Sequence, residues 1–141
     1  LLGSLYAGIG LADAGVTAVH SLSYPLGGKY GVGHGLANTM MLPAVMAFNL
    51  PAALEKFTDV AEAMGECVEG LPVRESAYLA LEAVEALIED CGINSTLAQF
   101  GVKEKDFPAL ADVALNVAVP LKNNPRKITK EDMIMIYAQA Y

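Results

Sequence analysis

The first third of this chain is almost free of charge, and this constrains its fold more than any other feature. Up to Leu54 the only ionised side chains are Asp13 and Lys29. A stretch this apolar must be buried, either against the rest of the domain or against a surface outside these residues. Between Glu55 and Asp90, by contrast, ten acidic residues accompany two basic ones. We expect this middle region to be amphipathic and in contact with solvent.

Composition then limits the class of protein. The chain has 141 residues, of which 54% are hydrophobic and 18% charged, so it can form one domain with a core and is not intrinsically disordered. The net charge of −7 argues against nucleic-acid binding, because phosphate contacts need clustered Lys and Arg. Cys67 and Cys91 cannot form a disulfide framework. We therefore expect a reducing compartment and a cytoplasmic location.

Two apolar runs resemble membrane-directed segments, but neither qualifies. Residues 1–19 have no basic flank, and Asp13 and several glycines interrupt them. Residues 36–48 are too few to span a bilayer and contain Pro43. We therefore expect no membrane segment. Because the chain starts with Leu1 rather than Met, we also expect that an N-terminal part is missing.

The residue pattern is helical almost throughout. Ala, Leu, Met and Glu dominate, and the alternation of β-branched residues that is typical of strands is missing. The pattern predicts an all-α fold, a compact multi-helix bundle of five to seven helices. The first helix is expected to end at Tyr24-Pro25, followed by a glycine-rich loop. The expected helices cover residues 5–22, 34–48, 52–64, 74–91 (with Gly92 as C-cap), 95–100, a long helix that starts at Asp106 as N-cap, and 130–141 with Thr129 as N-cap.

The only two histidines, His20 and His34, flank the glycine-rich loop. A tight loop would fold the two helix ends together, so that both imidazoles face one point. Imidazole nitrogens bind Fe(II) and Zn well, but two ligands do not complete a site. Asp13, two helical turns before His20, is the only nearby carboxylate. The alternative is that each histidine is a hydrogen-bonded core residue, and the spacing alone leaves both interpretations open.

Two further segments have a weaker claim to a ligand. The segment Gly31-Val-Gly-His-Gly35 places free N–H groups before a helix, as phosphate-binding loops do. No strand precedes it, however, and the third glycine and the later acidic residue of a dinucleotide fingerprint are missing. The basic residues from Lys122 to Lys130 are interpreted as a loop between two helices.

The stretch around the histidines resembles a known family. It reads His20-Ser-Leu-Ser-Tyr-Pro-Leu-Gly-Gly-Lys-Tyr-Gly-Val-Gly-His34-Gly-Leu-Ala-Asn, a His and a Pro-Leu-Gly turn followed by a His-Gly-x-Ala-Asn helix start. Leu42-Pro-x-Val-Met-x-Phe-Asn49, Asn124-Pro-Arg126 and the final helix Ile136-Tyr-x-x-Ala-Tyr141 support the same match. Over essentially its whole length, the chain is similar to the C-terminal helical domain of the iron-containing (group III) alcohol dehydrogenases.

This resemblance implies that residues 1–141 form a metal-binding, dehydroquinate synthase-like helical domain. In family members an α/β domain that binds NAD or NADP precedes it, and Fe(II) or Zn lies between the two domains. The metal is held by an upstream Asp and His, neither of which Asp13 matches, and by two later His residues, which His20 and His34 match. The implied reaction transfers hydride between an alcohol or aldehyde and a nicotinamide.

The resemblance also implies partners. These are a small alcohol or aldehyde substrate, the chain's own N-terminal nucleotide-binding domain, and further copies in a homo-oligomer. The 141-residue chain alone has half of the metal ligands and no nucleotide domain, so we expect it to be inactive.

One position departs from the family pattern. Many members carry another His four residues after the first of the pair, near the nicotinamide, where it is thought to help proton movement. This sequence has Tyr24, which is therefore the candidate catalytic residue, although a phenol exchanges its proton less readily than an imidazole near neutral pH. The motif does not separate alcohol dehydrogenases from glycerol dehydrogenase, maleylacetate reductase or hydroxyacid–oxoacid transhydrogenase. The alternative outside the enzymes is a helical interaction module whose histidines are structural.

Overall fold

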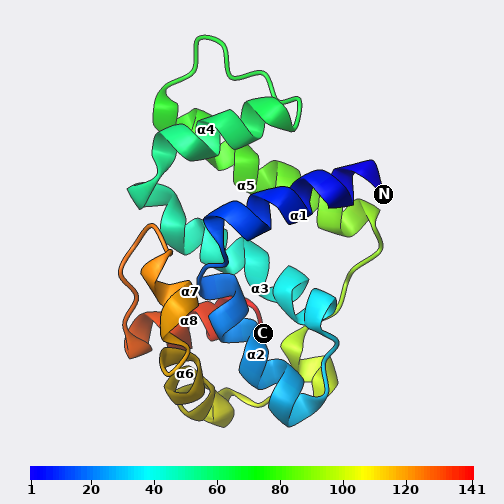
Figure 1. The fold of residues 1–141 in the computed structure, drawn as a ribbon, viewed down its shortest axis with the longest axis vertical. Coiled ribbons are helices and arrows are strands. Elements are labelled where there is room, and N and C mark those ends of the chain that lie inside the picture. The colour runs from blue at the N-terminus through cyan, green and yellow to red at the C-terminus, as the bar shows by residue number, and fades with distance from the viewer.

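The computed structural model describes residues 1–141, except for the side chains of residues 118 and 119. The described chain forms helices joined by loops and turns, and contains no strand. The predicted all-α class is confirmed, with eight α-helices instead of five to seven (Figure 1). The helices are α1 (Leu2–Ala14), α2 (Ala18–Tyr30), α3 (His34–Asn49), α4 (Leu54–Ala63), α5 (Val73–Asp90), α6 (Phe107–Leu115), α7 (Ala118–Lys122) and α8 (Lys130–Gln139), with 3-10 turns at Leu50–Ala52, Leu97–Phe100 and Glu104–Asp106.

The first predicted helix is in fact two helices. The chain breaks at Gly15, whose φ is 75°, and α2 runs at 105° to α1. Glycine suits this break because a side chain is strained at such a φ, and a Cβ here would lie 2.7 Å from Asn123 Nδ2. The break leaves Asp13 exposed on α1, whereas His20 lies on α2. The two residues therefore do not share a helix face.

The prediction that a helix ends before Pro25 is wrong. α2 continues through Pro25 to Tyr30 and ends at Gly31, which is left-handed with a φ of 68°. Proline removes one helical hydrogen bond, but its fixed φ is compatible with a helix. Leu22 and Leu26, one turn apart around Pro25, are both completely buried. Their burial in the core outweighs the lost bond, and the loop between the histidines shrinks to residues 31–33.

The hydrophobic core lies where α2, α3, α6 and α8 pack together. At its centre the buried Tyr137 hydroxyl of α8 donates a 2.7 Å hydrogen bond to the Leu22 carbonyl of α2. Burial raises the pKa of the Tyr137 phenol, so it stays a hydrogen-bond donor. The other large side chains that are completely or almost completely buried include Leu26, Met41, Val45, Leu110, Met133 and Ile136.

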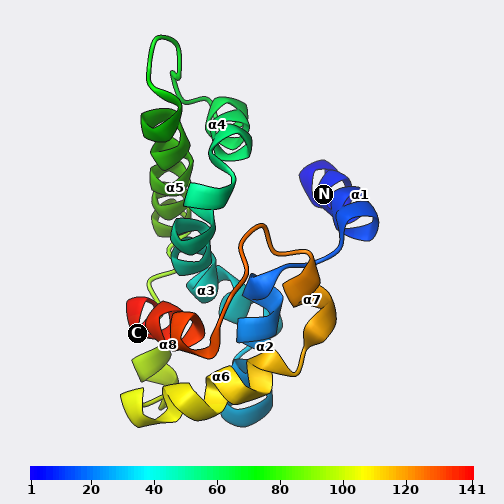
Figure 2. The same cartoon turned by 90° about the vertical axis from the view of Figure 1, so that its left-hand side faces the viewer.

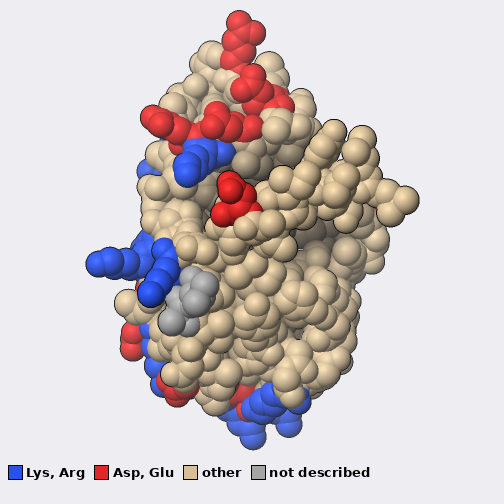
Figure 3. Space-filling model, viewed as in Figure 1, with Lys and Arg blue, Asp and Glu red and all other residues tan. Residues whose placement is uncertain are grey.

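α4 and α5 pack against each other and project from the core as a hairpin (Figure 2). The predicted C-cap of α5 is confirmed. Gly92 has a φ of 70°, its N–H donates to the Glu89 carbonyl, and the Ile93 N–H donates to the Ile88 carbonyl. Acidic side chains gather over this end of the molecule in Figure 3. This agrees with the solvated middle region expected from the charge pattern.

Two helix starts were predicted near the C-terminus, and only one of them has the expected side-chain cap. Thr129 caps α8 as predicted, because its Oγ1 accepts the Asp132 N–H while Asp132 accepts the Thr129 N–H. Asp106 is the N-cap residue of α6, as predicted, but its side chain makes no hydrogen bond to the first turn of the helix. Its carboxylate instead accepts the Lys103 N–H at the start of the 3-10 turn that precedes α6. The predicted long helix after Asp106 is shorter, since α6 ends at Leu115 and α7 follows.

α1 stands apart from the other helices (Figure 2). None of its residues is buried, and Leu2, Leu5, Tyr6 and Ile9 are each at least 59% exposed. Over the described chain, no single helix is long and apolar enough to cross a membrane; α1 and α2 reach that threshold only as a pair bent by 105°.

Candidate metal centre

His20 and His34 are brought together by the short turn between α2 and α3. His20 lies in the first turn of α2, and His34 is the first residue of α3. Their ring centroids are 5.3 Å apart, with the ring planes tilted by 58°. The left-handed conformation of Gly31 ends α2 and lets α3 start three residues later. The sequence-based expectation that a glycine turn makes the imidazoles face each other agrees with this geometry.

A single amide group lies against both imidazoles. Asn38 is one turn after His34 on α3, and its Nδ2 lies 3.4 Å from His20 Nε2 and 3.1 Å from His34 Nε2. Both Nε2 atoms thus lie within hydrogen-bond distance of the same amide nitrogen, and the tautomer of each ring decides which atom donates. Asn38 Oδ1 is buried and has no hydrogen-bond partner among the described residues. The two imidazoles therefore converge on one polar point.

The surroundings of His20 favour its neutral form. Burial lowers the pKa of His20 below its ordinary value, and the neighbouring His34 lowers it further. A neutral imidazole is the form that binds a metal, since a protonated ring has no free lone pair. His20 is partly buried, whereas His34 is exposed at the start of α3. The pair thus has one side toward the core and one toward solvent.

Tyr24 completes an aromatic cluster with the two histidines. It lies one turn after His20 on α2, and its ring is nearly parallel to that of His34, with a centroid separation of 5.9 Å and an angle of 15°. The edge-on contact with His20 has a separation of 6.2 Å. Tyr24 is 42% exposed, so part of this residue is accessible to a small molecule. All three residues proposed from the sequence therefore lie in one cluster.

Two pockets flank this cluster. One has a volume of about 340 Å³ and is lined by His20 and Asn38 together with mainly apolar residues of α1, α2 and α3. The other, of about 500 Å³, lies between α2 and α6 beside Tyr24 and is almost entirely apolar apart from Lys29. Both are open to the surface. A small organic molecule could approach the histidines or Tyr24 from either one.

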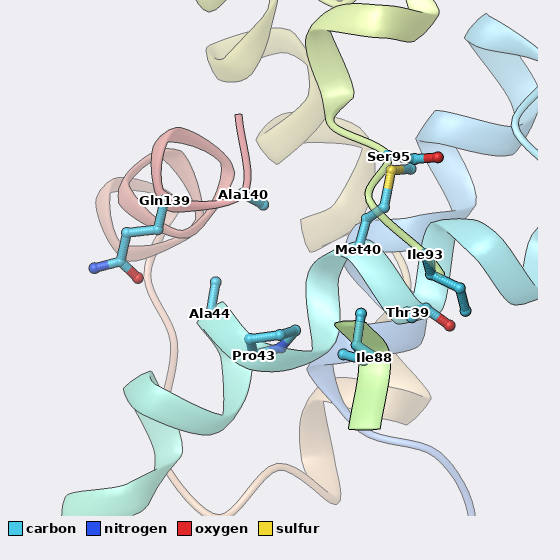
Figure 4. A pocket seen from close by; sticks show the side chains of 9 residues that line it. All are labelled: Thr39, Met40, Pro43, Ala44, Ile88, Ile93, Ser95, Gln139 and Ala140. Atoms are coloured by element: carbon cyan, nitrogen blue, oxygen red, sulfur yellow. The ribbon is translucent and has the colours of Figure 1, made fainter. Parts of the chain in front are cut away.

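A third pocket is not part of the site. It has a volume of about 220 Å³ and lies between α3, the end of α5 and α8 (Figure 4). Its walls carry Met40, Pro43, Ile88 and Ile93, and the polar groups at its edge are the uncharged side chains of Thr39, Ser95 and Gln139. No His or carboxylate lines it, so it offers no chemistry beyond apolar contact.

The donor set fits a metal ion but is incomplete. Two convergent imidazole nitrogens are ligands that Fe(II) and Zn accept readily. Catalytic zinc sites use three protein ligands, however, and no cluster of three or more His, Cys, Asp or Glu occurs among the described residues. Within the described residues the cluster therefore offers two candidate metal ligands, and these do not complete a site.

Comparison with known proteins identifies the family. Residues 1–141 match the model of the Fe-containing alcohol dehydrogenase family, C-terminal. The chain belongs to this family. Its domain is 42% identical over 140 residues to lactaldehyde reductase of Escherichia coli K12, covering 99% of this chain and 36% of that protein. It is 42% identical over 138 residues to 1,3-propanediol dehydrogenase of Citrobacter freundii, covering 98% and 35%.

Solved structures of the alcohol dehydrogenase family have the same helical fold. A 1,3-propanediol oxidoreductase superimposes with a TM-score of 0.87 at 41% identity, over 90% of this chain and 33% of that one. An alcohol dehydrogenase from Oenococcus oeni superimposes with a TM-score of 0.90 at 38% identity, over 96% and 35%. The chain thus spans about a third of the length of the relatives it matches.

Sequence reasoning did not single out Asn38 as a site residue of this alcohol dehydrogenase domain. The available signal was its position four residues after His34, which places both side chains on one face of a helix. That Asn38 also reaches His20 depends on the angle between α2 and α3, which no spacing along the chain reveals.

Proposed function

We propose that this chain is the metal-binding C-terminal domain of an NAD(P)-dependent alcohol dehydrogenase. We further propose that His20 and His34 together bind a single divalent iron or zinc ion, each through its Nε2 atom. The observation that carries this proposal is the convergence of both Nε2 atoms on the Asn38 amide, at 3.4 and 3.1 Å. Two Nε2 atoms that converge on one amide nitrogen can converge equally on one cation when each ring presents a lone pair there. The missing ligands and the nucleotide-binding domain would come from the residues that precede the family's C-terminal domain.

The substrate class follows from the pockets and the relatives. When bound, the metal supplies Lewis acidity toward an alcohol or carbonyl oxygen, and the nicotinamide exchanges the hydride. The residues of this chain supply position and exclude water, because the pocket beside His20 is mostly apolar and holds about 340 Å³. The relatives named above act on lactaldehyde and propanediol, which are small aliphatic compounds. We propose a small aliphatic alcohol or aldehyde for this protein as well.

Tyr24 has a separate proposed role. It is partly exposed beside the histidines, and its hydroxyl can donate a hydrogen bond to a substrate oxygen. Tyr24→Phe removes this donor and leaves the stacked ring in place. The expected result is a drop in kcat/KM of roughly tenfold, which corresponds to one hydrogen bond of about 1.4 kcal/mol.

Metal content tests the ligand assignment directly. In the complete protein, His20→Ala and His34→Ala should each abolish stoichiometric iron or zinc, measured by elemental analysis after purification and dialysis. Tyr24→Phe is the matched control and should retain its metal. If both alanine variants keep stoichiometric metal, the histidines are structural and the ligand assignment is wrong.

A further inference from the structure

The Asn124-Pro-Arg126 motif lies where α2 begins and α3 ends, far along the chain from either helix. We infer that Asn124 is a positioning residue for the histidine pair, because it ties the first turn of α2, which carries His20, to the helix that carries His34. The inference rests on the proposed function of the two histidines as metal ligands. We call Asn49, Asn124 and Arg126 the asparagine clamp.

Asn124 is buried, and its side-chain amide makes four hydrogen bonds to three residues. Its Oδ1 accepts from Asn49 Nδ2 at 2.9 Å and from the Ala18 N–H at 3.4 Å. Its Nδ2 donates to Asn49 Oδ1 at 2.7 Å and to the Arg126 carbonyl at 2.7 Å. Because a buried amide without partners is costly, this network holds its members in one arrangement.

At α2 the clamp takes the place of a local helix cap. Thr17 precedes the helix, but its side chain accepts no N–H of the first turn. Asn124 Oδ1 accepts the Ala18 N–H instead, so the cap comes from a residue 106 positions away in the chain. Ala18 is two residues before His20. Loosening of this turn therefore moves the imidazole directly.

At α3 the clamp holds the opposite end of the helix from His34. Asn49 is the last residue of α3. Arg126 Nη1 donates to the Phe48 carbonyl at 3.0 Å, and the guanidinium lies 4.1 Å from the centre of the Phe48 ring. One helix thus carries a histidine at its start and the clamp at its end. The clamp and the short 31–33 turn together determine how α2 and α3 lie relative to each other.

The affinity for a metal depends on how α2 and α3 lie relative to each other, because each helix carries one of the two nitrogen ligands. A displacement that separates their Nε2 atoms removes the shared binding point without changing either residue. The inference therefore predicts a specific loss of metal affinity when the clamp is broken, beyond the loss of stability that any buried substitution produces.

The test is Asn124→Ala in the complete protein, with Zn²⁺ as the probe and its dissociation constant measured by competition with a chelator. We expect zinc binding to weaken about tenfold, at the lower end of the effect of groups that orient metal ligands. Asn116→Ala is the matched control, because Asn116 is an exposed asparagine whose side chain donates to the nearby Asp112 carbonyl of α6. Thr129→Ala is a second control that lowers stability at α8, away from the clamp.

The outcomes separate this inference from the proposed function. If Asn124→Ala binds zinc as the unsubstituted protein does while its melting temperature falls as in Thr129→Ala, Asn124 is only structural and the inference is wrong. If Asn124→Ala does not fold, Arg126→Ala decides, since Arg126 is exposed: a several-fold loss of affinity supports the inference, and unchanged affinity overturns it. Zinc retained by the His20→Ala and His34→Ala variants would instead refute the ligand assignment itself.

Discussion

His20 differs from His34 because of where each residue lies on its helix. Both rings approach the same Asn38 amide, yet His20 is turned toward the core and His34 toward solvent. Burial lowers the pKa of His20, and the nearby His34 adds to this shift. His20 therefore keeps the neutral, metal-binding form to a lower pH than its ordinary pKa would allow.

This shift predicts how the stability of the metal-free protein changes with pH. The folded-state pKa of His20 is below its unfolded value of about 6.5, so below that value the unfolded chain binds more protons than the folded one. The free energy of unfolding should therefore fall as the pH drops from about 7 through the folded-state pKa. His20→Gln should flatten this part of the profile, measured by urea denaturation in the presence of a chelator. An unchanged slope in the variant would show that His20 does not cause it.

The helices show which local signals are sufficient to specify an element's ends. α8 starts where Thr129 and Asp132 form a capping box, and α5 ends at Asp90, two residues before Gly92, because these signals act within one turn of the chain. Pro25 is also a local signal, one that usually ends a helix, but α2 continues through it to Tyr30. The buried Leu22 and Leu26 contribute more free energy than the hydrogen bond that the proline removes.

Thr129→Ala measures one such local signal. The substitution removes the side-chain acceptor of the Asp132 N–H and should lower the free energy of unfolding by about 1 kcal/mol. Thr39→Ala is the control, because Thr39 lies inside α3 and its hydroxyl bonds the Gly35 carbonyl of its own helix. That change should be close to neutral, since alanine has the higher helix propensity. Chemical denaturation of both variants provides the comparison, and equal losses would mean that the capping box contributes nothing special.

On the scale of the whole molecule, the apolar first third is divided between two environments. α2 and α3 are buried in the core, as their lack of charge predicts. α1 is equally apolar but has no buried residue, and it lies on the weakly charged face seen in Figure 3. An exposed apolar helix of this size favours association with another surface. Under the proposed domain arrangement, that surface is the part of the enzyme outside these residues.

Paired substitutions in α1 test this view. In the 141-residue chain, Leu5→Glu with Ile9→Glu should leave the melting temperature almost unchanged, because both side chains are 59% exposed, and should reduce self-association in sedimentation experiments. Leu26→Ala, at a completely buried position, should instead cost about 3 kcal/mol. In the complete protein the same glutamates should be destabilising. A large loss of stability in the short chain would mean that α1 packs against the domain in solution.

The sequence by itself determined the helical class, the family and the residues of the histidine cluster. These depend on composition, on periodicity and on a motif in which His20, Tyr24 and His34 lie close together along the chain. The tertiary structure alone decided the break at Gly15, the continuation of α2 through Pro25, the approach of Asn38 to both imidazoles and the contact of Asn124 with α2. Each of these joins or separates groups through helix packing, and Asn124 lies 106 positions from its partner Ala18. Short-range patterns carry no information about contacts at that separation, because those contacts exist only after the core has formed.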